Sequence, residues 1–218
     1  MKRLYIIVEG QTEQEFVNEQ IAPYLRQHGI YEVTPILVRT SKSGRGGFVN
    51  YQHLRNDAKR LLSSRKKDFV VSMFVDFFRC PEVPQKERWN GKTNHLDQVV
   101  EMEKSIHEDI SDTRFIPYIQ LHEFEALLFS SNDGFTTFLS EEQAKKTQQI
   151  IESYDNPEDI NTTPSGAPSK RLLAIKDDYD KVIEGNLIAL EVGFLKIMEK
   201  CPRFKAWIEK LIESCKDE

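Results

Sequence analysis

The first residues of the chain form a strand–turn–helix pattern, and this pattern constrains the fold more than any other feature. Residues 4–8 are continuously apolar, as expected of a strand buried on both faces of a parallel sheet. Glu9 and Gly10 end this run, and Thr12 with Glu15 has the spacing of a capping box at a helix start. We therefore expect Glu9 at the carboxyl end of a buried strand, where open α/β sheets bind ligands. The alternative is a solvated strand end beside an ordinary turn.

Two later segments repeat this pattern of an apolar strand followed by a carboxylate. Residues 69–75 lead into Asp76, and the next expected strand leads into Glu123 and Glu125. Because parallel strands place their carboxyl ends at one edge of a sheet, we expect Glu9 and Asp76 to lie close together. On a helix Glu123 and Glu125 would point about 200° apart, so we expect only one of them to reach the same site.

Carboxylates gathered at one sheet edge favour a hard divalent cation. Oxygen ligands of this kind suit Mg²⁺ or Mn²⁺. The candidate metal ligands are therefore Glu9, Asp76, Glu123 and Glu125. The alternative is a set of solvated strand ends. For His122, which precedes Glu123, we prefer a packing role to a role as a ligand.

The remaining pattern predicts an α/β fold with a mostly parallel sheet flanked by helices, and with a helical C-terminal part. A strand at 33–38 contains Pro35, which suits a sheet edge, and Pro23 should kink or restart the first helix. Further expected elements are a strand at 114–121, helices at 50–64, 96–110, 126–129, 141–153, 187–198 and 204–215, and loops at 77–92 and 155–169. We expect a core at 1–130 and a mainly helical extension at 131–218, with one domain over the whole chain as the alternative.

Basic residues concentrate in one stretch of an acidic chain. The formal net charge is −5, but residues 39–67 contain nine basic residues and a single acid. Such asymmetry can create a basic face for nucleic acid, and glycines in this stretch would let the backbone approach a phosphate. The candidate phosphate contacts are Arg39, Lys42 and Arg45 in this stretch, and Lys170 and Arg171 at a later helix start. The alternative for both groups is solvated charge that neighbours in space balance.

Several classes of protein are disfavoured by what the chain lacks. No apolar run approaches the ~20 residues of a membrane span, and no small-residue cleavage site follows the N-terminus, so we expect neither a membrane protein nor a signal peptide. The three cysteines form no CxxC pair, which disfavours a zinc ribbon or a disulfide framework. Reduced thiols in the cytoplasm are the simplest expectation.

Motifs along nearly the whole chain carry a family resemblance. The matching pieces are Val8-Glu9-Gly10-Gln11-Thr12-Glu13, Gly46-Gly47 with Tyr51, Val75-Asp76-Phe77-Phe78, Pro117 to Phe129 with the string HEFEALLF, Asn156-Pro157-Glu158, Pro168-Ser169-Lys170-Arg171, Tyr179-Asp180-Lys181, and Cys201-Pro202-x-Phe204-x-x-Trp207. The first piece resembles motif one of Toprim (topoisomerase–primase) domains. The whole set resembles a Toprim-like bacterial family, domain of unknown function 4276.

The resemblance implies a Toprim-like α/β fold and a cytoplasmic bacterial protein. In Toprim domains the first-strand Glu is a general acid/base or a metal ligand, and an Asp-x-Asp on a later strand binds Mg²⁺. The motifs assign these roles to Glu9 and, for the first Asp, to Asp76. This sequence departs from the pattern at the second position, which is Phe78. The usual metal pair is therefore incomplete, and Glu123 or Glu125 is the candidate replacement.

The resemblance also implies partners. Toprim relatives include topoisomerases, primases and the overcoming-lysogenization-defect (OLD) nucleases, and some Toprim-like proteins work beside an ATPase in phage defence. The expected partners are therefore DNA or RNA, an ATPase subunit and a second copy of the chain, with no membrane.

Phosphodiester hydrolysis is the function that these features predict, in a nuclease that depends on Mg²⁺ or Mn²⁺. Glu9 and Asp76 are the candidate catalytic carboxylates. Lys181 is the candidate catalytic cation that stabilises charge developing on the phosphate, with Lys170 or Arg171 as alternatives. We find no tyrosine at an identifiable nucleophile motif, which favours hydrolysis over strand passage.

Two other functions remain in view. The first is a catalytically degenerate Toprim-like interaction subunit that binds a partner or nucleic acid without cleaving it, and Phe78 supports it. The second is a small-molecule phosphohydrolase with Asp76 as nucleophile, which predicts an Asp-x-Asp-x-Thr sequence that Phe77-Phe78-Arg79 does not supply.

Overall fold

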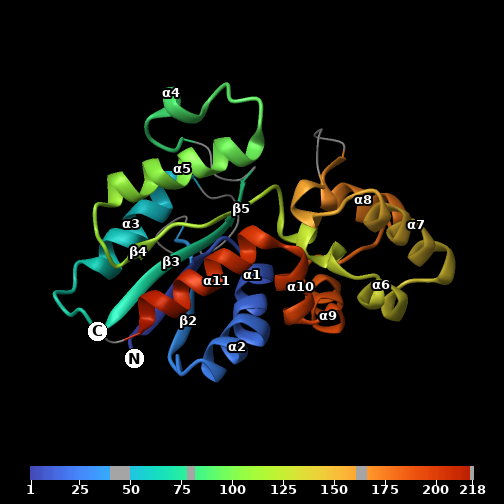
Figure 1. Cartoon of the computed structure of the whole chain (residues 1–218), viewed down its shortest axis with the longest axis horizontal. Coiled ribbons are helices and arrows are strands. Elements are labelled where there is room, and N and C mark those ends of the chain that lie inside the picture. The colour runs from blue at the N-terminus through green and yellow to red at the C-terminus, as the bar shows by residue number, and fades with distance from the viewer. Residues whose placement is uncertain (40–49, 78–81, 161–165, 217–218) are drawn as a thin grey trace.

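A parallel β-sheet forms the centre of the computed structural model, which describes residues 1–39, 50–77, 82–160 and 166–216. Its strand order is β2-β1-β3-β4, with β5 also paired to β3 (Figure 1). All pairings are parallel, and the strands are β1 (Arg3–Val8), β2 (Val33–Leu37), β3 (Phe69–Asp76), β4 (Phe115–Ile116) and β5 (Ile119–Gln120). The predicted α/β class with a parallel sheet is confirmed.

The two longest strands lie side by side in the middle of the sheet. Every residue of β3 is buried, as its continuous apolar sequence predicts. Val8 of β1 pairs with Phe74 of β3. Glu9 is the first residue after Val8, and Asp76 is the second residue after Phe74, so both carboxylates lie at the same end of the sheet. The edge position of β2 agrees with Pro35, because proline cannot donate a ladder hydrogen bond.

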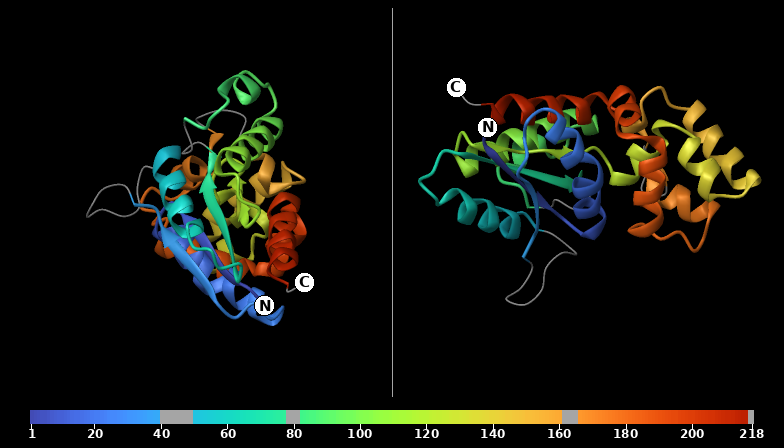
Figure 2. Two further views of the ribbon diagram at one scale, coloured as in Figure 1. Left: turned by 90° about the vertical axis from the view of Figure 1, so that its left-hand side faces the viewer. Right: turned by 90° about the horizontal axis from the view of Figure 1, so that it is seen from below.

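Helices cover both faces of the sheet, because alternate side chains of each strand point to opposite faces. One face packs against α1 (Gln11–Phe16), the turn η1 (Val17–Ile21), α2 (Ala22–Gln27) and α11 (Pro202–Cys215). The other packs against α3 (Tyr51–Leu62) and α5 (His95–Ile110). Figure 2 shows these layers, with α11 running along the sheet. Trp207 anchors α11, since its indole N–H donates to Ser72 Oγ on β3 at 3.0 Å.

Several predicted elements are revised by the structure. The expected strand at 114–121 is two short strands, because Pro117 lies between them and cannot continue the ladder. The first helix contains a π turn and then restarts as α2 with Pro23 in its first turn, where the missing N–H costs nothing. The loop expected at 77–92 contains the short helix α4 (Lys86–Trp89).

The C-terminal part is helical, as predicted. It consists of α6 (Asp133–Phe138), α7 (Glu141–Glu152), η4 (Pro157–Asp159), α8 (Pro168–Ile175), α9 (Ile183–Val192), α10 (Phe194–Lys200) and α11. Figure 1 shows α6 to α9 beyond one end of the sheet, while α11 returns along it. The division into two domains stays a prediction. Among the helices that the structure describes, none is both long and apolar enough to cross a membrane.

Candidate functional site

Carboxylates from different elements meet at the carboxyl edge of the sheet. Glu9 and Asp76 lie at the ends of the adjacent strands β1 and β3, and both side chains are buried. The pairing of Val8 with Phe74 brings the two strand ends to one edge, and burial, followed among the acids by Glu13 and Glu9, raises the pKa of Asp76. The expectation that these two strand ends meet is therefore confirmed.

A third carboxylate, Glu13, joins this edge from the first turn of α1. Its Oε2 accepts the backbone N–H of Gly10 at 3.0 Å and so caps the helix. The capping pair expected from Thr12 and Glu15 is wrong, because Gly10 takes the extended N-cap position directly after the strand. Glu13, three residues later, is then the side chain that can reach back. Sequence spacing from Gly10 contained this signal, but no role in the site was predicted for Glu13.

The HEFEALLF string supplies a fourth carboxylate. It forms η3 (Phe124–Ser130), a 3₁₀ helix whose side chains are all buried. The backbone N–H of Phe124 donates to Asp76 Oδ1 at 2.9 Å, which ties η3 to the end of β3. Glu125, the next residue, is fully buried and accepts no hydrogen bond from any described residue. Such an orphaned carboxylate calls for a positive partner.

Lys181 provides positive charge from the segment between α8 and α9. Its Nζ lies 3.3 Å from Glu125 Oε2, 3.5 Å from Asp76 Oδ2 and 3.7 Å from Glu13 Oε1. We call Glu13, Asp76, Glu125 and Lys181 the acidic cluster. Its members come from α1, β3, η3 and the segment between α8 and α9, so parts of the chain far apart in sequence build it.

The acidic cluster contains more negative than positive charge. Burial raises the pKa of Asp76 well above its ordinary value, and the neighbouring carboxylates raise it further. Burial likewise raises the pKa of Glu125. Burial opposes the charge on Lys181, but Asp76, Glu125 and Glu13 outweigh it and raise the pKa of the ammonium. One lysine therefore faces several buried acids, an imbalance that an additional cation would relieve.

The donor chemistry of this edge fits a hard divalent cation. Glu125 offers buried oxygens without hydrogen bonds, and Asp76, Glu13 and Glu9 add carboxylate oxygens beside it. The positions do not yet form a metal site, since no three His, Cys, Asp or Glu side chains in the described ranges are arranged to hold an ion. The ammonium of Lys181 lies between the carboxylates instead.

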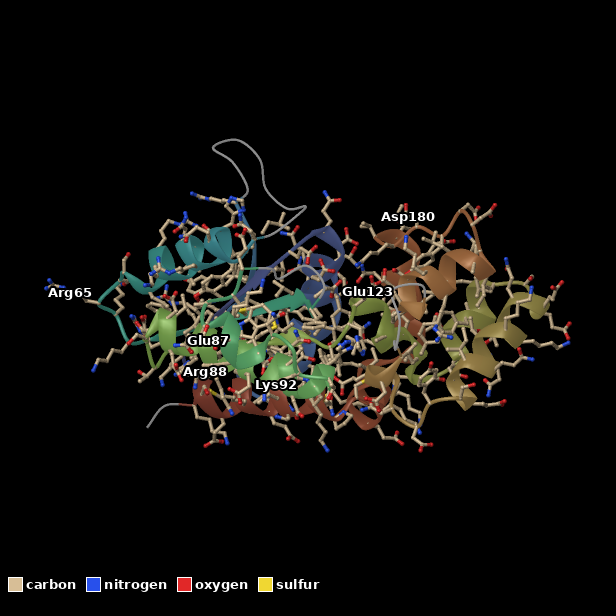
Figure 3. All side chains as sticks on the ribbon, turned by 90° about the horizontal axis from the view of Figure 1, so that it is seen from above. Arg65, Glu87, Arg88, Lys92, Glu123 and Asp180 are labelled. Atoms are coloured by element: carbon tan, nitrogen blue, oxygen red, sulfur yellow. The ribbon has the colours of Figure 1, made fainter. Side chains whose placement is uncertain are left out.

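Glu123 has a different role from Glu125. Its Oε2 accepts the backbone N–H of Ser169 at 3.0 Å, in the first turn of α8. The expectation that only one of the two glutamates reaches the strand-end site agrees with this arrangement. Figure 3 shows Glu123 in the same part of the molecule as Asp180, where the C-terminal helices meet the sheet.

The start of α8 was predicted to bind phosphate through Lys170 and Arg171. The helix begins at Pro168, and the carboxylate of Glu123 already lies at its N-terminus. Arg171 donates to Gly166 O at 2.7 Å and to Tyr154 Oη at 3.0 Å, so its guanidinium is held in the fold. Lys170 is exposed.

The basic stretch is spread over both ends of the sheet. Arg39 follows β2 and is exposed, and with Arg60 and Gln14 it lines a hollow of about 360 Å³. Arg65 lies at the far end of the molecule (Figure 3). The predicted single basic face is therefore divided, and its part near the site centres on Arg39. Two other predicted contacts, Lys42 and Arg45, lie outside the described residues, as does Phe78.

His122 is buried and has the unusual backbone angle φ of +69°. Its ring makes an edge contact with that of His95 at 5.2 Å between centroids. Burial, with His95 second, lowers the pKa of His122 to about 4, so the imidazole is neutral at pH 7. This agrees with a packing role.

Tyr179, like Glu13, had no role in the site predicted from the sequence. Its hydroxyl is buried without a hydrogen-bond partner among the described residues, and burial followed by the charge of Glu125 raises its pKa. The hydroxyl lies against Gly185, where an added Cβ would come within 2.7 Å of it. The Tyr-Asp-Lys string had signalled this segment.

Comparison with protein families gives a match over almost all of the chain. The model of the family described as "Domain of unknown function (DUF4276)" matches residues 8–212. The chain belongs to the DUF4276 family. This confirms the family that the motifs indicated, and the match spans both the sheet and the C-terminal helices of the DUF4276 chain. No curated protein matches it.

Two solved structures resemble the DUF4276 chain over nearly its full length. Both are of the C-terminal region of the Xanthomonas campestris pv. campestris OLD protein, one phased with mercury and one with iodine. The first has 16% sequence identity and a TM-score of 0.48, and covers 99% of this chain and 95% of that one. The second has 15% identity and a TM-score of 0.46, and covers 99% and 94%.

Proposed function

We propose that this protein is a divalent-metal-dependent phosphodiesterase that cleaves DNA or RNA. The observation that carries the proposal is the acidic cluster: buried carboxylates from three separate elements converge at the carboxyl edge of a parallel sheet, and one ammonium neutralises them incompletely. Open α/β sheets bind ligands at this edge. Buried, unbalanced charge of this kind is costly and is typical of functional sites.

Each residue of the site has a proposed task. Asp76 and Glu125 would hold Mg²⁺ or Mn²⁺, and Glu9 would be a further ligand or the group that moves a proton from water. Glu13 adds a carboxylate while its other oxygen caps α1. When bound, the metal supplies positive charge for the phosphate and lowers the pKa of a water molecule. Lys181 would stabilise the charge that develops on the phosphate.

Nucleic acid has a proposed approach along the β2 side of the site. Arg39 and Arg60 line the hollow beside Gln14, one helical turn from the start of α1. Both guanidinium groups belong to residues that are exposed. Contacts of this kind hold a phosphate backbone without reading its sequence.

Cleavage of plasmid DNA and total RNA by the pure protein tests the proposal. The assay compares Mn²⁺, Mg²⁺ and EDTA, and includes Glu9→Gln and Asp76→Asn. The control is Glu103→Gln on α5, because Glu103 Oε1 accepts hydrogen bonds from Ile119 N–H and Arg203 Nη2 and so belongs to the fold. We expect metal-dependent cleavage that both site variants lose and Glu103→Gln keeps. Cleavage that survives in both site variants would place the chemistry elsewhere.

The second candidate is an interaction subunit without catalysis. It is favoured by the position of Lys181, which already supplies a cation to the acidic cluster, and by Phe78 in place of the second Asp. Its proposed partners are an ATPase subunit, nucleic acid or a second copy of the chain, and its proposed setting is phage defence in the cytoplasm. Absence of both cleavage and Mn²⁺ binding by calorimetry, with a complex detected by sedimentation, would support it.

A further inference from the structure

We infer that the ammonium of Lys181 is the resident counter-ion of the metal-free site, and that a divalent cation must displace it to bind. This inference rests on the proposed function, and it concerns how the site is regulated. Lysine and metal would then be alternative occupants of one position rather than simultaneous members of one site.

The geometry of the acidic cluster carries this inference. Three carboxylate oxygens from different elements lie 3.3, 3.5 and 3.7 Å from one nitrogen. These distances exceed the ~2.7–2.9 Å of a charge-assisted hydrogen bond, so the ammonium is shared among the acids instead of bound tightly by one. Mg²⁺ or Ca²⁺-sized ions need oxygens at about 2.0–2.6 Å. An ion at this position would draw the carboxylates inward and leave no room for the ammonium.

Lys181 has a route out of the cluster, whereas the acids do not. Its side chain is 37% exposed to solvent, whereas those of Glu13 and Asp76 are 3% exposed and that of Glu125 is fully buried. Rotation of its flexible four-carbon chain would carry the ammonium to water.

The backbone that carries Lys181 is fixed on either side. Lys176 contacts Glu184 at 2.8 Å, and Asp180 Oδ1 accepts the N–H of Ile183 at 2.8 Å. Displacement therefore needs a change of side-chain rotamer and no movement of the helices. The released ammonium would stay beside the metal, where a substrate phosphate would meet it. Metal binding would thereby convert Lys181 from a counter-ion of the acids into a ligand of the substrate.

Binding of Mn²⁺ to the purified full chain without nucleic acid tests the exchange. The variants are Lys181→Met, which keeps an unbranched apolar chain but removes the ammonium, and Lys181→Arg, which keeps the charge. Lys196→Met is the control, since it removes a lysine from a surface ion pair with Glu199. The readouts are calorimetric affinity for Mn²⁺ and the thermal midpoint Tm in EDTA and in Mn²⁺.

The expected result for Lys181→Met is a lower Tm in EDTA together with about tenfold or greater tightening of Mn²⁺ binding, because the competing cation is gone. Lys181→Arg should bind Mn²⁺ no more tightly than the wild type, and Lys196→Met should match it in both readouts. A folded Lys181→Arg with tighter binding would overturn the inference, and it keeps the test decisive even if Lys181→Met fails to fold.

Failure of the exchange is distinguishable from failure of the proposed function. If the wild type binds Mn²⁺ and cleaves, but Lys181→Met binds it with the same or lower affinity, the exchange is wrong and the nuclease stands. If neither protein binds Mn²⁺, both the exchange and the metal-dependent function are wrong.

Discussion

Two groups of carboxylates in this protein differ in how many hydrogen bonds they accept from the surrounding fold. In the acidic cluster at the sheet edge, Glu125 accepts no hydrogen bond from the described residues. The second group, which we call the α11 cap network, consists of the fully buried Glu158, the half-buried Glu103 and their partner Arg203. Both groups join the C-terminal helices to the sheet region. In the acidic cluster Asp76 and Glu13 each accept one backbone N–H and Glu125 accepts none from the described residues, whereas both carboxylates of the α11 cap network are hydrogen-bonded.

The α11 cap network shows how this fold buries a carboxylate for structure. Glu158 is fully buried, and its two oxygens accept the backbone N–H groups of Arg203 and Phe204 at 2.9 and 3.1 Å. Glu103 Oε1 accepts from Arg203 Nη2 and from the N–H of Ile119, both at 2.8 Å. These bonds supply partners for the first turn of α11, which would otherwise leave orphan donors.

The difference separates a structural from a functional use of buried charge. A carboxylate with both oxygens bound to backbone donors, as in Glu158, holds elements together and gives its acceptor capacity to the fold. Carboxylates that share one mobile lysine are held by the fold around them, and they keep that capacity. Substitutions that remove a charge should therefore have opposite consequences in the two groups.

The largest expected difference is in catalysis. Asp76→Asn should reduce metal-dependent cleavage by about 10²-fold or more, the usual scale for loss of a group that stabilises transition-state charge. Glu103→Gln should change the cleavage rate less than about threefold at a temperature where both variants are folded. Initial rates on a labelled oligonucleotide would measure both. Equal losses in the two variants would erase the distinction between the groups.

The next effect is in stability. Glu158→Gln should lower the free energy of unfolding by about 1–3 kcal/mol, because one backbone N–H at the start of α11 then faces an amide donor in a buried site. Urea denaturation followed by circular dichroism would measure it. A loss below ~0.5 kcal/mol would mean that water replaces the carboxylate and that the cap contributes little.

Removing a carboxylate charge from the acidic cluster should raise the stability of the metal-free protein instead of lowering it. Burial raises the pKa of Glu125 as it raises that of Glu158, so the ionised form disfavours folding at pH 8. Glu125 accepts no hydrogen bond from the described residues, so its substitution leaves no backbone donor unpaired and removes only the cost of burying charge. Glu125→Gln should therefore raise the urea midpoint of the metal-free protein at that pH, and it should weaken the stabilisation that Mn²⁺ gives. Lower stability in EDTA would show that the contact with Lys181 outweighs the cost of burial.

Stability should also depend on pH. Burial raises the pKa of Glu158 from 4.5 to about 7, so the folded state holds this proton more tightly than the unfolded chain. The resulting stabilisation is full below about pH 4.5 and is lost as the pH rises through 7. Glu158→Gln should show a flatter fall of Tm across this window. An unchanged slope would assign the dependence to Asp76 and Glu125, whose pKa values are also raised.

The sequence by itself determined the parallel sheet and the edge at which its carboxylates gather. Continuous apolar runs specify strands buried on both faces, and Glu9 and Asp76 directly follow two of them. The same local logic placed Pro35 on an edge strand. Only one departure from a strand pattern was large, at Pro117, where the ladder is interrupted.

Only the tertiary structure decided which charges meet. Lys181 and Asp76 are separated by 105 residues, and no periodicity links such distant positions. The choice of Glu125 over Glu123, the entry of Glu13 into the site and the use of Glu123 at the start of α8 all depend on how η3 and α8 pack. Hydrophobic pattern is a local property of the chain, whereas the pairing of buried charges is fixed by the packing of whole elements.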